Sequence, residues 1–185
     1  MEHTSLLDNE AFQRDYEALK HVQLHPGRHT AENAWQHCEQ VRARSASLAT
    51  QNALSKDAHH KLDMLSLLHD IGKIEGTARP EKSVELMERY GVEQLDWLKS
   101  LVKYHDTNLP WYISAQKQQA PSDKAWRKLL KHVDIDLLCL FMIADRVDCP
   151  GGWKENKALM WFVHEVEKRK LLSQPLYIDE DTISL

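Results

Sequence analysis

The apolar residues of this chain recur at spacings of three, four and seven, which is the period of a helix that buries one face. Ala34, Cys38, Val41 and Leu48 form one such stripe. We find no convincing alternation of apolar and polar residues of the kind that predicts a strand. The predicted helices cover about residues 9–21, 31–53, 56–71, 81–90, 92–105, 124–147 and 153–170. The pattern therefore predicts an all-α fold, a bundle of six to seven helices.

Helix boundaries follow from the residues that cap helices well. Thr30 is expected to cap the second helix, Ser55 the third, and Ser122 or Asp123 the long helix that follows. Residues 106–121 form the longest stretch without a helical pattern. Loops of that length are often functional lids, and otherwise simple surface loops. We expect an irregular segment there.

The whole chain, residues 1–185, is expected to form one domain because no repeat or linker divides it. Its core would span about 25–150, followed by the 153–170 helix and a peripheral tail over 171–185. Apolar residues make up 42% and charged residues 28%, the usual mix of a globular protein. With six Gly and six Pro, the chain also has few of the turn residues that an all-β fold needs.

Charge and cysteine content narrow the range of partners. A net charge of -4 gives no reason to expect bulk nucleic-acid binding. The three cysteines are not in CxxC spacing, which excludes a zinc ribbon or a disulfide framework. We see no signal peptide, and the longest apolar run is far short of the ~20 residues that span a bilayer. We expect a cytoplasmic protein with no membrane partner, and the sequence leaves a homodimer open.

The unusual count is histidine, with 11 residues, and neutral imidazole is the commonest metal ligand. His69 and Asp70 lie inside the apolar run MLSLLHDIGK. Burying a carboxylate costs several kcal/mol unless it is paired or binds a metal. A hydrogen-bonded His–Asp pair is the simpler alternative. Adjacent residues on a helix point ~100° apart, so a metal site here needs ligands from other helices.

Two further residues satisfy that need. His37 lies on the apolar side of its predicted helix, and the alternative to a metal ligand there is a core histidine with satisfied hydrogen bonds. Asp145 closes the run LLCLFMIAD, and the alternative there is a surface carboxylate at a helix end. With His69 and Asp70 they supply two imidazoles and two carboxylates. Such mixed ligands suit Mn²⁺, Fe²⁺, Co²⁺, Ni²⁺, Zn²⁺ or Mg²⁺ and do not choose among them.

This order of residues resembles the HD-domain superfamily of metal-dependent phosphohydrolases. LLHDIGK is typical of that family's helix, WQHCEQV resembles the segment with its first His, and LVKYHD and IADRVD resemble its later helices. The likeness is closest to the HD domain of bacterial tRNA nucleotidyltransferases and to stand-alone relatives, and covers roughly residues 25–150. It implies an all-helical fold, hydrolysis of a phosphate ester, and metal binding by His37, His69, Asp70 and Asp145.

Hydrolysis of a phosphate ester at a metal ion suggests further roles for residues in and around this set. A divalent cation lowers the pKa of bound water, and Asp70 would orient that water or act as its base. Lys73 would neutralise phosphate charge, unless it is a solvated lysine at a helix end. His105 would contact phosphate, act as general acid or bind a second metal, with a plain helix-capping role as the alternative. Arg146, at the mouth of the site, and Arg28, in the loop before the His37 helix, are expected to bind substrate, with a plain surface role as the favoured alternative for Arg28.

The two-metal members of the superfamily usually carry extra histidines between His-Asp and the last helix. Residues 71–104 contain none, which favours one divalent metal ion. It also disfavours a di-iron oxygenase of the same fold and a cyclic-dinucleotide phosphodiesterase. Asp148, like Arg146, is expected at the mouth.

The expected function is that of a stand-alone phosphohydrolase. Its substrate would be a small phosphorylated metabolite, a nucleotide or cyclic nucleotide, attacked by metal-activated water. A metal-containing module that senses or binds nucleotides without turnover is the main alternative, and the oxygenase is the next.

Overall fold

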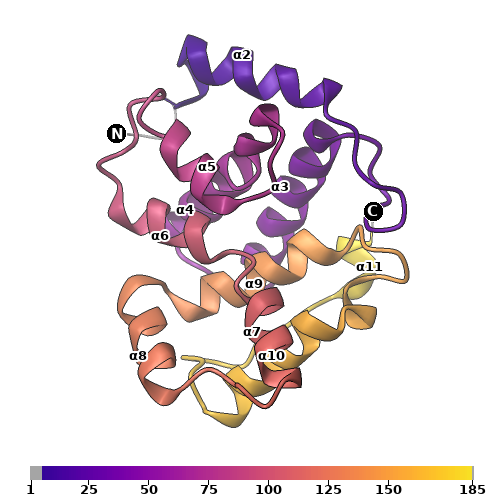
Figure 1. Cartoon of the computed structure of the whole chain (residues 1–185), viewed down its shortest axis with the longest axis vertical. Helices are drawn as coiled ribbons and strands as arrows, with labels where there is room; N and C mark the ends of the chain where they lie inside the picture. The colour runs from indigo at the N-terminus through magenta and orange to yellow at the C-terminus, as the bar shows by residue number, and fades with distance from the viewer. Residues whose placement is uncertain (1–5, 185) are drawn as a thin grey trace.

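The computed structural model describes residues 6–184, and every regular element within them is helical (Figure 1). Ten α-helices lie in this part of the chain, which confirms the all-α fold class and exceeds the six or seven predicted. Their bounds are α2 (Glu10–Ala18), α3 (Ala34–Gln51), α4 (Lys56–Leu68), α5 (Pro80–Leu86), α6 (Asp96–Tyr104), α7 (Asn108–Gln116), α8 (Asp123–His132), α9 (Ile135–Arg146), α10 (Lys157–Lys168) and α11 (Glu180–Ile183). Short 3₁₀ helices are η1 (Leu19–His21), η2 (Ile71–Glu75) and η3 (Trp153–Glu155).

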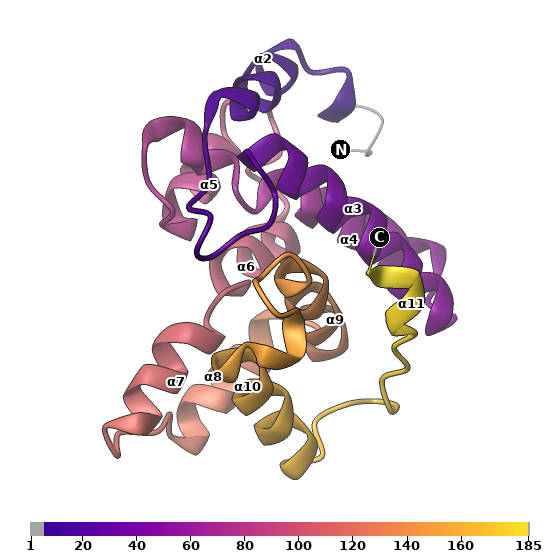
Figure 2. The same ribbon diagram turned by 90° about the vertical axis from the view of Figure 1, so that its right-hand side faces the viewer.

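The arrangement centres on three helices. The two long helices α3 and α4 lie side by side, and α9 packs against both (Figure 2). Helices α7, α8 and α10 gather at the end of the molecule opposite α2 (Figure 1). None of the helices in residues 6–184 combines the length and apolarity needed to cross a membrane.

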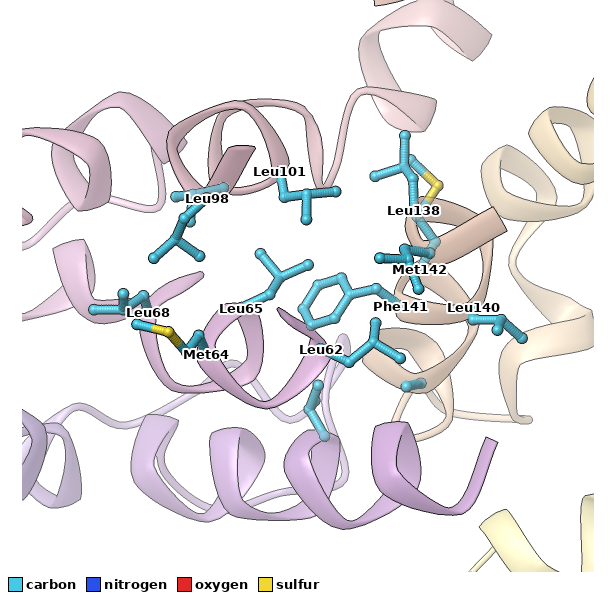
Figure 3. Close-up of a cluster of buried hydrophobic side chains, with 14 of the residues drawn as sticks. Leu62, Met64, Leu65, Leu68, Leu98, Leu101, Leu138, Leu140, Phe141 and Met142 are labelled. Carbon is cyan, nitrogen blue, oxygen red and sulfur yellow. The ribbon is translucent and has the colours of Figure 1, made fainter. Parts of the chain in front are cut away.

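The core explains why these helices hold fixed positions. Helix α9 is buried on almost every side, as expected of a central helix that is apolar all round. Leu65 of α4, Leu101 of α6 and Phe141 of α9 point toward one another in this core (Figure 3). Since close packing resists displacement, residues at the ends of α4 and α9 are held in place by it.

Capping residues set several boundaries. Ser55 and Ser122 cap α4 and α8 as predicted, each accepting a hydrogen bond from a backbone N–H three residues on. Thr30 does not cap α3, which begins later, after Asn33. The reason is that residues 22–24 pair antiparallel with residues 32–34 around a loop, and Gln23 and Asn33 make an isolated bridge. The chain is therefore not free to turn into a helix at residue 30.

The predicted helix over 124–147 is instead two helices. Val133 is extended, and the Asp134 side chain accepts hydrogen bonds from the backbone N–H groups of Asp136 and Leu137 at 3.0 and 3.3 Å. A new helix therefore starts at Ile135. Asp134 was not recognised as an N-cap because apolar periodicity continues on both sides of the break.

The expected irregular segment over 106–121 is mostly helix α7, so the loop prediction was wrong. Pro110 is the third residue of α7, where its missing N–H costs no helical hydrogen bond. Trp111 packs edge-on against Trp126 with ring centroids 4.8 Å apart, and also lies against Phe162. These aromatic contacts hold the segment as a packed helix.

Three further predicted segments differ in extent. The helices predicted over 81–90 and 92–105 are the shorter α5 and α6, with turns between them, and the one over 153–170 divides into η3 and α10. The tail, which the structure describes as far as residue 184, is less peripheral than expected. It returns to the C-terminal end of α3, where the Tyr177 N–H donates to Asn52 Oδ1 at 2.8 Å and Ile183 is buried.

Candidate metal centre

Three separate segments bring the four predicted ligands together. His37 lies in the first turns of α3, His69 and Asp70 follow the end of α4, and Asp145 lies in the last turn of α9. All four side chains are buried. The structure thus places them in one cluster inside the helical bundle.

The atoms that face one another are those that bind metals. His69 Nε2 lies 3.4 Å from His37 Nε2, 3.4 Å from Asp70 Oδ2 and 3.4 Å from Asp145 Oδ1. His37 Nε2 lies 3.7 Å from Asp70 Oδ2 and 2.8 Å from Asp145 Oδ1. Two ring nitrogens and two carboxylate oxygens therefore surround a common point.

These spacings fit a divalent cation. Zinc, for example, binds His nitrogen and carboxylate oxygen at about 2.0–2.1 Å, which places tetrahedral ligands roughly 3.4 Å apart. Four of the five distances match that separation, and the fifth, between His37 and Asp145, has the length of a hydrogen bond. The buried His and Asp groups, among them His37, His69 and Asp70, could hold a metal ion.

The turn after α4 explains how two adjacent residues serve one site. Asp70 is not on the helix, as the sequence had suggested, because α4 ends at Leu68 and Asp70 leaves helical geometry. Ser83 of α5 holds this turn, accepting from the Gly72 N–H at 2.9 Å and donating to the His69 carbonyl at 3.0 Å. A Cβ at Gly72 would lie 2.8 Å from the Ser83 nitrogen. The Gly in HDIGK therefore permits the close approach that directs Asp70 into the site.

Hydrogen bonds also determine which nitrogen of His69 has its lone pair free to face the cluster. Its Nδ1 lies 3.0 Å from the Ser66 carbonyl, so we assign the ring proton to Nδ1 and leave the Nε2 lone pair free. The His105 ring packs against the His69 ring with centroids 5.2 Å apart. Its Nδ1 lies 2.6 Å from the Val102 carbonyl, so the same reasoning leaves its Nε2 free.

Charge keeps both carboxylates ionised. Burial raises the pKa of Asp70, but attraction to Lys73, His69 and His37 outweighs burial and holds that pKa well below its usual range. Lys73 Nζ lies 2.8 Å from Asp70 Oδ2. The pKa of Asp145 is likewise held well below its ordinary value, because Arg146 and the two imidazoles outweigh its burial. Both groups are therefore available as anionic ligands at neutral pH.

His37 carries the opposite shift. Burial lowers the pKa of His37, but hydrogen bonds to Asp145 and Asp148 outweigh burial and raise it to about 9. Without a metal, His37 is therefore a cation between two carboxylates at neutral pH.

A cavity of about 540 Å³ opens onto this cluster and is lined by His37, Asp70 and Asp145, but not by His69. The residues predicted to act on substrate also line it: Arg28, Lys73, His105 and Arg146. Arg28 comes from the exposed loop before α3, whereas Arg146 Nε lies 3.8 Å from Asp145 Oδ2. The cavity thus joins the ligand cluster to three cationic side chains.

Asp148 does not lie where it was predicted. It does not line the mouth, because it is buried behind His37, with its Oδ2 2.8 Å from His37 Nδ1 and 3.5 Å from His29 Nδ1. Burial raises the pKa of Asp148, but these two imidazoles outweigh it and keep that pKa well below its usual range. The signal that could have found it is its spacing of three residues from Asp145, at the end of an apolar helix. The sequence carries no comparable signal for Ser83, whose hydroxyl holds the turn after α4.

Comparison with known proteins gives this geometry no outside support: the chain matches no protein-family model, no curated protein and no solved structure.

Proposed function

We propose that this protein is a metal-dependent phosphohydrolase, similar to the HD-domain superfamily, that uses one divalent ion. Its substrate would be a small phosphorylated metabolite, a nucleotide or cyclic nucleotide. The observation that carries the proposal is the set of four His and Asp donor atoms, spaced as ligands of one ion, on the wall of a cavity that also holds cationic side chains.

His37, His69, Asp70 and Asp145 would hold the ion. A divalent cation there would supply a polarised phosphoryl oxygen and a water of lowered pKa. Asp70 would orient the attacking water by accepting its hydrogen bond. The low pKa of Asp70 makes it a weak base at neutral pH, since efficient general bases titrate near the working pH. Asp70 would therefore orient the water and not act as its base.

The cationic residues would bind the phosphate. Lys73 is held 2.8 Å from Asp70, and Arg146 lies beside Asp145, so both cations border the ligand cluster. Fixed positive charges next to a reacting phosphate stabilise the charge that develops in the transition state. Arg28, on its exposed loop, would reach the same phosphate from the cavity rim.

His105 would protonate the leaving oxygen. The contact of its Nδ1 with the Val102 carbonyl leaves Nε2 available, and the residue lines the cavity. In its protonated form, Nε2 would donate that proton. No other residue is assigned this step.

Phosphate release from a substrate panel tests the proposal. Protein treated with a chelator would be reloaded with Mn²⁺, Co²⁺, Ni²⁺, Zn²⁺ or Mg²⁺ and offered p-nitrophenyl phosphate, bis-p-nitrophenyl phosphate, nucleoside monophosphates and cyclic nucleotides. We expect activity only with metal, and its loss in Asp70→Ala with helix content unchanged. Asp57→Ala, which removes an exposed carboxylate from the first turn of α4, is the control and should remain active.

Activity in the presence of chelator, or full activity of Asp70→Ala, would contradict the mechanism. Binding of metal and nucleotide without phosphate release would identify the sensing module instead. Two irons per chain by elemental analysis would identify the oxygenase.

A further inference from the structure

The imidazole of His37 lies between two carboxylates that come from one helix end. Asp145 Oδ1 is 2.8 Å from Nε2, and Asp148 Oδ2 is 2.8 Å from Nδ1. Residues three apart at a helical turn lie on the same face, so both carboxylates can reach opposite edges of one ring. In the proposed metal site only the first edge binds the ion, which leaves the role of the second edge to be explained.

Asp148 is poorly explained as a structural residue alone. It is 1% exposed, and its Oδ1 has no hydrogen-bond partner among residues 6–184. A buried carboxylate with one unpaired oxygen costs free energy that a neutral side chain would avoid. The groups that its other oxygen meets are two imidazoles, those of His37 and His29. Its side-chain contacts are therefore directed at the site.

A comparison with His69 shows what a carboxylate partner adds to His37. His69 Nδ1 meets a neutral backbone carbonyl, that of Ser66. His37 Nδ1 instead meets a carboxylate, which accepts the same proton and also adds negative charge behind the ring. Such outer partners fix the tautomer of a metal-binding histidine and make its other nitrogen a stronger donor.

We propose that Asp148 is a positioning residue for the metal centre: it accepts the Nδ1–H of His37 and thereby presents Nε2 to the ion. This inference rests on the proposed metal site, and it assigns Asp148 no contact with metal or substrate. Of the two imidazoles that Asp148 Oδ2 meets, His37 is the one within hydrogen-bond distance, at 2.8 Å, whereas His29 Nδ1 is 3.5 Å away.

Metal affinity of Asp148 variants tests the proposal. Zn²⁺ and Mn²⁺ dissociation constants of the whole chain would be measured by competition with a chelator above pH 9, where proton competition at His37 no longer differs between the variants. Loss of such outer partners typically weakens metal binding about 10–100-fold, and we expect that loss for Asp148→Ala. Asp148→Asn keeps an oxygen that can accept from Nδ1–H, so it should recover part of the affinity. Asp57→Asn, an exposed carboxylate exchange on α4, should change nothing.

A second measurement separates positioning from folding and needs no variant. In the Zn²⁺-loaded wild-type protein with ¹⁵N-labelled histidine, the NMR spectrum should show His37 with a proton on Nδ1 and metal on Nε2. A proton on Nε2 with metal on Nδ1 would overturn the proposal, even if Asp148→Ala fails to fold.

The remaining outcomes are also distinct. A folded Asp148→Ala protein that binds metal within threefold of the wild type would overturn the role of Asp148 and leave the proposed function standing. A wild-type protein that binds neither ion would overturn both.

Discussion

Metal binding should release the proton that His37 carries in the metal-free protein. Burial lowers the pKa of His37, but its two carboxylate partners raise it to about 9. An ion that takes Nε2 must displace the proton on it. At pH 7, two units below that pKa, only about one ring in a hundred is neutral, which makes the apparent affinity about 100-fold weaker than its limit.

The direction and size of the pH effect follow from that value. Apparent affinity should rise about tenfold per pH unit below pH 9, about 1.4 kcal/mol per unit, and level off above it. Asp70 and Asp145 should not contribute, because their pKa values lie far below this range. The midpoint should therefore lie well above that of an ordinary imidazole.

Isothermal titration calorimetry with Mn²⁺ measures both quantities. Titrations of the chelator-treated protein between about pH 7 and pH 9 give the affinity, and buffers of different ionisation enthalpy count the protons released, about one per ion near pH 7. The His37→Gln variant should bind weakly and release no such proton. Equal affinity across the range, or no proton release by the wild type, would refute this account of His37.

Three other results are expected. The metal-free protein should lose stability, on the order of 3 kcal/mol, as pH rises from about 6.5 through 9, because the raised pKa of His37 favours the folded state only while the ring is protonated. Urea unfolding in the presence of chelator measures the free energy of unfolding at each pH. A free energy that does not change with pH contradicts this expectation. Gly72→Ala should destabilise by about 1–3 kcal/mol and weaken metal binding, since its Cβ would meet the Ser83 backbone; wild-type Tm and metal affinity would show that the turn adapts. Phe141→Ala should cost about 3–5 kcal/mol by opening a cavity in the core, whereas a loss under 1 kcal/mol in urea unfolding would show that the core collapses around the change.

The cost of burying charge allowed most of the proposed ligands to be predicted from the sequence. His69, Asp70 and Asp145 stand in or at the end of strongly apolar runs, where an unpaired charge is expensive, so the sequence alone marks them as residues that need partners. His37 was found by helical periodicity. Helical periodicity also made the helices predictable, because their apolar residues recur with the spacing of a helix that buries one face.

The parts that the sequence did not predict depend on contacts between distant segments. The Asp70 side chain enters the site because α4 stops at Leu68, and that turn is held by Ser83 of another helix. Helix α7 is stabilised by the packing of Trp111 on later helices. The spacing of three from Asp145 places Asp148 near the site, but it does not show on which side of His37 the carboxylate lies, and that depends on the contact with α3.

The C-terminal segment has a consequence for the order of folding. Asn52 at the end of α3 is hydrogen-bonded in both directions to the backbone of Tyr177, 125 positions later. Closing so long a loop costs entropy that is recovered only when the late segment docks. During synthesis, the C-terminal end of α3 therefore lacks this cover until residues near Ile183 have left the ribosome.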